Sequence, residues 1–286
     1  MADPKKRLSE NVEGLFFVDS TCIDCDTCRQ LAPENFDESG DYSFVYHQPE
    51  TSEQLFRSSL ALLSCPTGSI GTLKSINLLS AREALPEKIE SNVYYNGFAS
   101  PNSFGASSYF IQHPEGNWLI DSPKYLPHLR DKLAAMGGIR YIFLSHRDDV
   151  CDAHRYAEIF GSERLIHRSE LSAEPKAEHT FDGYDPIKIG TDFTIIPTPG
   201  HTKGHAALLY KDRYLFSGDH LWWSRNRNGL TASQSVCWYS WPMQIESVKR
   251  LLDHKFEWVL PGHGERANFA HTKMQSELRK LLMRIG

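Results

Sequence analysis

The chain has 286 residues, of which 40% are hydrophobic and 12% aromatic, so it is long enough for one large domain with a small addition or for two domains. Its formal net charge of −5 gives no electrostatic basis for binding nucleic acid. The basic start, Lys5 to Arg7, is followed by no apolar run of signal-peptide or membrane-spanning length. We therefore expect a cytoplasmic protein whose partners include neither nucleic acid nor a membrane.

Six cysteines are present, and three of them, Cys22, Cys25 and Cys28, fall within seven residues. Cys65, which Pro66 follows, lies much further along the chain. Such close cysteines in a chain without an export signal favour metal or cluster binding over disulfides. The C-x₂-C-x₂-C spacing lets three thiolates wrap one face of a compact cluster, while a fourth arrives from elsewhere. A structural zinc site is the alternative, although zinc sites usually combine two separated C-x₂-C pairs.

This arrangement resembles ferredoxins with a single [4Fe–4S] cluster. In two-cluster ferredoxins the Cys-Pro pair closely follows the third cysteine and the whole pattern is repeated, whereas here the pair is displaced and nothing repeats. The segments 31–36 and 64–70 around the cysteines are also similar to those of small ferredoxins. The resemblance implies a small ferredoxin-like domain, residues 1–80, with one [4Fe–4S] cluster held by Cys22, Cys25, Cys28 and Cys65.

Residues 72–92 are charged and mixed, which predicts a junction with a short helix near residues 80–85 and a second domain over residues 81–286. From residue 93 onward, short apolar runs alternate with helical patterns. Strands are expected at 107–111, 117–121, 141–144, 164–167, 193–196, 206–210, 213–217 and 257–260, and helices at 126–136, 153–160, 242–252 and 269–283.

Four of these strands end in a turn that carries a potential metal ligand. The four side chains are His146, His201, Asp219 and His263. Gly200 lets the backbone turn closely enough to push His201 out of its strand end. One such histidine is unremarkable in a protein, but four ligands at strand ends in one domain predict a metal site built on loops of a sheet scaffold.

These motifs resemble the metallo-β-lactamase fold superfamily. The matching segments are Leu119-Ile120-Asp121, Leu144-Ser145-His146, Pro199-Gly200-His201-Thr202-Lys203-Gly204-His205, Ser217-Gly218-Asp219 and Pro261-Gly262-His263-Gly264, and their order covers residues 93–286. The His-Thr-x-Gly-His motif is most similar to that of the glyoxalase II-like branch. The resemblance implies an α+β chain, in which an αββα sandwich follows the ferredoxin-like domain and carries metals at one edge of its sheets. It also implies His146 and His201 on one metal, His263 on the other, and Asp219 as the bridge.

The first metal motif departs from the superfamily pattern His-x-His-x-Asp-His. Position by position, the second His becomes Asp148, the Asp becomes Val150 and the last His becomes Cys151. Asp148 can bind through oxygen, and the flavodiiron branch also places a carboxylate there. Val150 cannot bind a metal, and Cys151 could ligate as a thiolate or be a small packed residue. An alignment that inserts two residues instead offers Asp152 as a ligand, with His154 nearby as either a ligand or a surface residue of the following helix.

Several residues near these motifs have structural as well as functional interpretations. His205 and His220 are expected to orient or pack against the ligand loops. Trp238, like the other tryptophans of this region, could line a pocket or belong to the core. Arg225 and Arg227 lie in a loop rich in Gly and Asn and could bind an anionic substrate.

Together these features predict a metal-dependent hydrolase with one or two divalent metals, zinc or iron, that acts on a small-molecule substrate. His201 and Asp219 are the catalytic candidates, because the metal would activate a water that Asp219 holds and orients. Two alternatives stay open. One is a redox enzyme, with an electron-transfer partner, in which the cluster feeds electrons to a mono- or di-iron site. The other is a redox sensor with a degenerate metal site.

Overall fold

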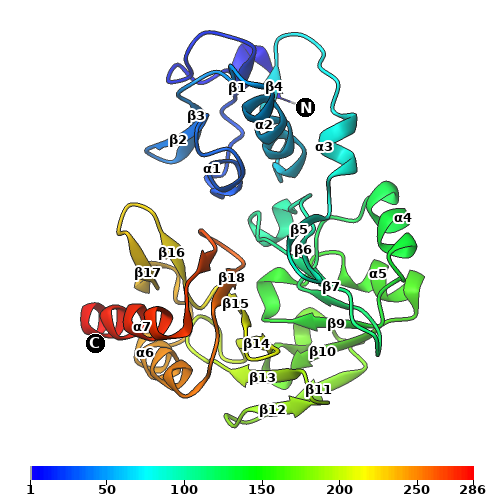
Figure 1. The fold of residues 1–286 in the computed structure, drawn as a ribbon, viewed down its shortest axis with the longest axis vertical. Coiled ribbons are helices and arrows are strands. Elements are labelled where there is room, and N and C mark those ends of the chain that lie inside the picture. Colours follow the sequence, from blue (N-terminus) through cyan, green and yellow to red (C-terminus); the bar gives the residue numbers. More distant parts are fainter. Residues whose placement is uncertain (1) are drawn as a thin grey trace. The chain divides into compact units, whose positions relative to one another are not determined.

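The computed structural model describes residues 2–286, and the chain divides into two compact units (Figure 1). One unit is Met1–His113 together with Pro123–Gly137. The other is Pro114–Ser122 together with Gly138–Gly286. Within residues 2–286, every helix falls short of the length and apolar character needed to cross a bilayer.

The cysteine-rich part of the first unit is built from two antiparallel pairs of short strands and two helices. The strand pairs are β1 (Phe16–Val18) with β4 (Ile70–Thr72), and β2 (Phe36–Ser39) with β3 (Tyr42–Val45). The helices are α1 (Thr27–Leu31) and α2 (Ser52–Ser64). The rest of this unit holds the antiparallel strands β5 (Glu87–Glu90), β6 (Val93–Tyr95) and β7 (Tyr109–Ile111), with α3 (Leu79–Glu83) and α4 (Pro127–Ala135).

Helix α2 places Cys65 at its carboxyl end. The helix begins with a capping box, in which Thr51 Oγ1 accepts a hydrogen bond from Gln54 N (3.1 Å). It ends at Ser64 because Pro66 disfavours helical geometry at the residue before it. Cys65 therefore leaves the helix in an extended conformation.

The first sheet of the second unit is parallel. Its strands are β8 (Trp118–Ile120), β9 (Tyr141–Leu144), β10 (Glu163–His167) and β11 (His179–Phe181). Helix α5 (Ala153–Phe160) connects β9 to β10 and packs against β10. Because parallel strands share one carboxyl edge, Asp121 after β8 and His146 after β9 lie at the same edge of this sheet.

The second sheet of this unit is mixed. Its strand order is β12 (Ile187–Ile189), β13 (Phe193–Pro197), β14 (Ala206–Tyr210), β15 (Tyr214–Gly218), β18 (Trp258–Pro261) and β19 (Ala267–Asn268). Only β15 and β18 pair in parallel. A separate hairpin, β16 (Trp222–Ser224) with β17 (Gly229–Thr231), follows β15.

The two sheets of the second unit pack face to face. Trp118 of β8 stacks on Phe193 of β13, with ring centroids 4.3 Å apart. On the other face of the second sheet, Leu209 and Leu215 join one buried apolar cluster with residues of α6 (Trp241–Arg250) and α7 (His271–Ile285) (Figure 1). With α5 on the first sheet, this order of layers confirms the expected α+β fold with an αββα sandwich.

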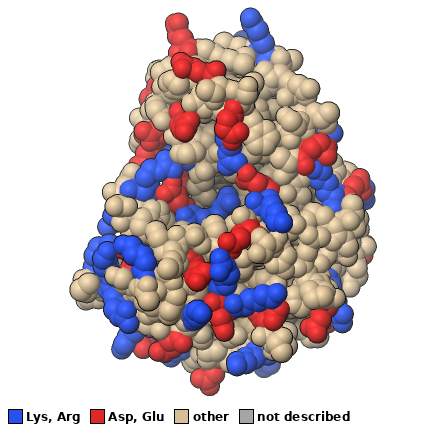
Figure 2. Space-filling model, in the orientation of Figure 1, with Lys and Arg blue, Asp and Glu red and all other residues tan. Residues whose placement is uncertain are grey.

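Charged side chains of both signs are interspersed on the molecular face drawn in Figure 2. This mixture agrees with the small net charge of −5. On that face, Lys and Arg form no continuous basic surface of the kind that nucleic acids bind.

Candidate functional site

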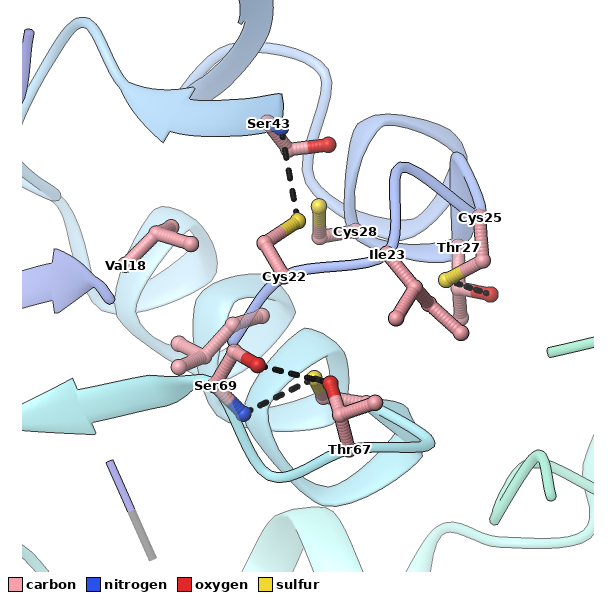
Figure 3. Close-up of a pocket in the computed structure, with 11 residues that line it drawn as sticks. Val18, Cys22, Ile23, Cys25, Thr27, Cys28, Ser43, Thr67 and Ser69 are labelled. Atoms are coloured by element: carbon pink, nitrogen blue, oxygen red, sulfur yellow. Dashed lines mark hydrogen bonds between the residues drawn. The ribbon is translucent and has the colours of Figure 1, made fainter. Parts of the chain in front are cut away.

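The four cysteines of the ferredoxin-like motif line one pocket (Figure 3). Cys22 and Cys25 come from the loop before α1, Cys28 from its first turn and Cys65 from the end of α2. The other lining residues are apolar or carry hydroxyl groups: Val18, Ile23, Thr27, Ser43, Thr67, Ser69 and Ile70. Four sulfurs around one hollow fit a [4Fe–4S] cluster, which four thiolates hold.

Burial favours the protonated form of three of these thiols, Cys22, Cys25 and Cys28. It raises the pKa of Cys22 and of Cys28, and it raises the pKa of Cys25 to about 11. Near neutral pH such thiols are protonated, so they are poor nucleophiles by themselves. A bound metal reverses this preference because coordination deprotonates the thiol, and the site is therefore better suited to holding a cluster than to covalent catalysis.

Arg29 holds the cysteine loop in its unusual backbone conformation. Asp24 (φ 55°) and Asp26 (φ 67°) both adopt the left-handed region, which non-glycine residues seldom occupy. Arg29 donates from Nη1 to Asp24 Oδ1 and from Nε to Asp26 Oδ1, each at 2.6 Å. It also reaches Ser43 Oγ (2.9 Å), and the backbone N–H of Ser43 donates to the sulfur of Cys22 (3.5 Å). One guanidinium thus ties the loop to the strand that hydrogen-bonds a cluster ligand.

Gly105, in the segment between β6 and β7, lies directly against the cysteine loop. A Cβ at this position would come within 2.6 Å of Cys25 Cβ and 2.9 Å of its sulfur. The backbone oxygen of Gly105 accepts a hydrogen bond from Thr27 Oγ1 (3.3 Å). Only glycine fits this contact, so the segment that follows β6 forms one wall beside Cys25.

The second candidate site lies at the strand ends of the sandwich. His146 follows β9, Asp219 follows β15 and His263 follows β18, while His201 lies in the loop between β13 and β14. That loop packs tightly on α6, since a Cβ on Gly200 (φ 153°) would lie 2.3 Å from Gln244 Cβ. The expected ligand loops therefore converge, each held at the end of a buried strand.

His146 and His201 each place Nε2 near the same two carboxylate oxygens, at distances typical of ligands around one metal ion. The Nε2 atom of His146 lies 3.7 Å from Asp148 Oδ2 and 3.5 Å from Asp219 Oδ2. The Nε2 atom of His201 lies 3.5 Å and 3.6 Å from the same two oxygens. Tetrahedral ligands with bonds of about 2.1 Å sit about 3.4 Å apart, close to these values. In the described part of the chain both Nε2 atoms are buried without a hydrogen-bond partner, so this donor set fits a divalent cation.

A second group of possible donors lies beside Asp219. A Cβ added at Gly262 would lie 2.5 Å from Oδ1 of Asp219 and 3.0 Å from Oδ2 of Asp149. Both oxygens therefore face this glycine. The nitrogen His263 Nε2 lies 3.8 Å from Asp219 Oδ2. Neither oxygen of Asp149 has a hydrogen-bond partner among residues 2–286, although the side chain is buried. His146, Asp149 and Asp219 form a second group whose possible ligand atoms have metal-ligand spacing, so Asp219 adjoins both groups of donors.

The carboxylates of this site differ in charge. Burial alone would raise the pKa of Asp219, but the neighbouring histidines, His263 first, hold it well below its usual range. Burial, followed by the charge of Asp219, raises the pKa of Asp149 well above its ordinary value. These shifts favour ionisation at Asp219 and protonation at Asp149, and a second cation would compete with the proton on Asp149.

His146 is oriented by a short chain of hydrogen bonds. Asp121 accepts from the N–H of Ser145 (2.8 Å) and from its hydroxyl (3.0 Å), and burial raises the pKa of Asp121 to about 6. When Asp121 is ionised, the Ser145 hydroxyl donates to it and accepts from Nδ1 of His146 (2.9 Å). This tautomer leaves the lone pair of Nε2 directed at the site.

His205 and His220 do not belong to the ligand groups. His205 uses Nδ1 on Thr198 Oγ1 (2.8 Å), and its Nε2 accepts from the backbone N–H of Asp219 (3.2 Å), so it positions Asp219. His220 is fully buried, 5.7 Å from His205 between ring centroids, and burial lowers its pKa to about 3. It is a neutral packed ring.

The remaining residues of the altered first motif lie apart from the convergent donors. Asp152 is the N-cap of α5, and its carboxylate faces Arg155 at 3.9 Å. His154 is exposed on the first turn of that helix. Cys151 is half-buried with a left-handed backbone (φ 39°). Among the described residues, the groups with metal-ligand spacing include Asp148 and Asp149 and leave Asp152 outside.

Two residues that the motif comparison missed complete the site. Asp149 lies in a 3-10 turn, Arg147–Asp149, which turns it inward one position before the register of the superfamily motif. Glu170, fully buried after β10, accepts from the N–H of Gly204 (2.6 Å) and from Arg147 Nε. It thereby joins the His146 loop to the His201 loop. The tandem acidic pair 148–149 was a visible signal for Asp149, whereas no local pattern marked Glu170.

Comparison with known proteins defines the class of both parts of the chain. Residues 18–72 match the family model described as the 4Fe-4S single cluster domain of Ferredoxin I. The sandwich has the metallo-β-lactamase fold, as several solved structures show. The chain thus joins a ferredoxin-type domain to a domain of that fold.

Three solved structures illustrate the likeness. The DIM-1 metallo-β-lactamase exposed to ceftazidime is 16% identical, with a TM-score of 0.52 over 70% of this chain and 96% of its own. A metallo-β-lactamase from Pontibacter korlensis is 18% identical, with a TM-score of 0.51 over 69% and 96%. The BLEG-1 B3 metallo-β-lactamase is 18% identical, with a TM-score of 0.50 over 62% and 93%. At these identities the likeness is one of fold.

Proposed function

We propose that the chain is a metal-dependent hydrolase of a small molecule, with a built-in [4Fe–4S] domain. The observation that carries the proposal is the set of four donors from His146, Asp148, His201 and Asp219, with nitrogen-to-oxygen distances of 3.5, 3.6 and 3.7 Å. We also propose a cytoplasmic location, because cysteines that bind metal stay reduced, without forming disulfides, in reducing compartments.

The residues divide the work between holding a cation and orienting water. His146, His201 and Asp148 would hold the first cation, and Asp149 and His263 would hold a second. A bound divalent cation supplies activation of water and polarisation of a scissile carbonyl or phosphoryl group. Asp219, whose Oδ2 faces the histidines of both positions, would orient the water and accept its hydrogen bond.

The test is hydrolysis by the zinc-loaded full chain of a panel of carboxylic esters, thioesters and phosphate esters. We expect turnover of at least one class and a loss of about 100-fold or more in Asp219→Asn, which keeps the side-chain shape but removes the charge. His154→Ala, on the exposed turn of α5, is the matched control and should retain the rate. A metal-loaded chain that hydrolyses no member of the panel would contradict the proposal.

A second candidate, a redox enzyme fed by the cluster, is favoured by the donor chemistry. Three carboxylates (Asp148, Asp149, Asp219) stand beside three imidazoles, a set that suits iron as well as zinc. An electron-transfer partner would reduce the cluster. In the iron-loaded chain with a reduced cluster, reoxidation by O₂ should then be faster in the wild type than in His201→Ala. Equal rates would remove this candidate.

A further inference from the structure

An exposed aromatic surface lies next to the metal-ligand loop. Val236, Trp238 and Tyr239 are 37%, 67% and 46% exposed, in the segment between β17 and α6. They are half of the six large hydrophobic side chains that the second unit exposes within the described residues. Large apolar groups gathered at one place on a surface mark binding sites more often than single exposed ones do.

The segment that carries these rings is fixed to the loop of His201. The backbone N–H groups of Trp238 (2.9 Å) and Tyr239 (3.1 Å) donate to the carbonyl oxygen of His201. The N–H of Ser240 (2.9 Å) and the thiol of Cys237 (3.0 Å) donate to the carbonyl oxygen of Gly200. Because three backbone N–H groups and one thiol anchor this segment, the exposed rings are held in place beside the site rather than on a free loop.

The ring of Trp238 is close to the candidate chemistry. Its centroid lies 6.2 Å from that of the His201 ring, at an interplanar angle of 61°. The Nε2 atom of the same His201 ring faces Asp148 and Asp219. A planar group stacked on the exposed face of Trp238 would therefore place an adjacent bond near the donors.

We propose that Trp238, with Tyr239 and Val236, is the specificity surface of this site, and that its substrate carries an aromatic ring next to the hydrolysed bond. This inference rests on the proposed hydrolase function. The surface suits an aromatic ring because indole stacks on flat π-systems, and Val236, Trp238 and Tyr239 include no acidic or basic side chain. A rigid indole also loses little conformational entropy when it binds, since only two side-chain torsions need to be held.

The test compares matched substrates in the zinc-loaded full chain. Phenylacetyl and propionyl thioesters of one thiol differ only in the group at the end of the acyl chain, a phenyl ring or a methyl. We expect a kcat/KM ratio of at least about tenfold in favour of the phenylacetyl substrate, expressed mainly in KM. Trp238→Ala should abolish this preference and Trp238→Phe should keep most of it. Tyr184→Ala, which removes another exposed aromatic ring of the second unit, is the control and should change neither.

Binding without turnover separates this inference from the proposed function. Titration calorimetry of the same protein with phenylacetate and with propionate should show tighter binding of phenylacetate, by about tenfold, and a loss of that difference in Trp238→Ala. If this holds while no thioester is hydrolysed, the aromatic site stands and the hydrolase function fails. If thioesters are hydrolysed but the wild type shows no preference for the ring in rate or in binding, the aromatic site is refuted.

Discussion

Gly105 is the residue at which the segment after β6 comes closest to the cluster ligands. Its backbone is left-handed (φ 88°), and an added Cβ would approach Cys25 more closely than side-chain atoms tolerate. Two separate demands, conformational and steric, therefore select glycine here. The steric demand acts on the expected cluster site, because the atoms that would have to move belong to Cys25, one of the four cysteines that line it.

We predict that Gly105→Ala loses most of its cluster. The added methyl would displace Cys25 or force the segment between β6 and β7 away from it. Iron and sulfide content and the EPR spectrum of the reduced protein measure the effect. Gly40→Ala is the matched control, since Gly40 is also left-handed (φ 63°) but has nothing within 4 Å of its Cβ position among the described residues. Wild-type cluster content in Gly105→Ala would show that this contact is not required.

Asp149 illustrates why single ligands are harder to foresee than ligand loops. The loop could be predicted because an apolar strand ends at Leu144 and a histidine follows closely. Which carboxylate turns inward depends on the 3-10 turn Arg147–Asp149, whose geometry a motif alignment does not contain. The alignment therefore pointed to Asp148 and Asp152, and the structure adds Asp149 between them.

Among the elements, the short 3-10 helix Arg168–Ala173 after β10 supports both ligand loops. Its Glu170 carries a fully buried carboxylate that both ligand loops use, through Gly204 and Arg147. Groups that orient ligands from behind typically change metal affinity by 10- to 100-fold. Glu170 accepts hydrogen bonds from the backbone of Gly204 and from the side chain of Arg147, which is next to His146. We therefore infer that it positions the ligand loops.

Glu170→Ala should weaken binding of the non-cluster metal by about tenfold or more, measured by competition with a chelator. Glu170→Gln should recover part of the affinity, because its amide oxygen can still accept from Gly204 N–H but no longer pairs with Arg147. Glu158→Gln, on the exposed face of α5, serves as the control. If Glu170→Ala lowers the melting temperature of the metal-free protein and leaves metal affinity unchanged, Glu170 is merely structural.

The connection between β10 and β11 predicts a specific pH dependence of stability. Arg164 donates to Glu178 from its backbone N–H (2.7 Å) and from its guanidinium, and this contact lowers the pKa of Glu178 from 4.5 to about 2. A depressed carboxyl pKa stabilises the fold above the unfolded value of 4.5, and the contribution is lost as the pH falls toward 2. The melting temperature of Glu178→Gln should therefore fall less between about pH 5 and about pH 3 than that of the wild type, whereas Glu158→Gln should follow the wild type. Parallel curves for all three would contradict the assignment.

Elements with strong local signals were the predictable ones. The expected strands 141–144 and 206–210 have the same bounds in the structure, because continuous apolar runs between turn residues specify buried strands. The hairpin of β16 and β17 was not expected, since Trp222–Thr231 mixes aromatic residues with a polar turn. Glu170 was also missed, because a buried charge is defined by its distant partners rather than by its neighbours in sequence.

At the scale of the whole molecule, the chain carries two different sets of potential metal donors. The cysteine pocket offers four soft sulfur donors, whereas the strand-end site offers imidazole nitrogens and carboxylate oxygens. Each set is complete within its own unit: Cys22, Cys25, Cys28 and Cys65 in one, and the histidines and aspartates in the other. Loss of one metal should therefore leave the other in place.

The most direct test of this account is metal quantitation with EPR on anaerobically purified wild type, Cys25→Ala and His201→Ala. The wild type should contain about four cluster irons and about one or two further divalent metals per chain. His201→Ala should lose the further metal and keep the EPR signal of the reduced cluster, and Cys25→Ala should show the reverse. A wild type that carries cluster iron and no other metal would contradict the metal centre, and with it both proposed activities.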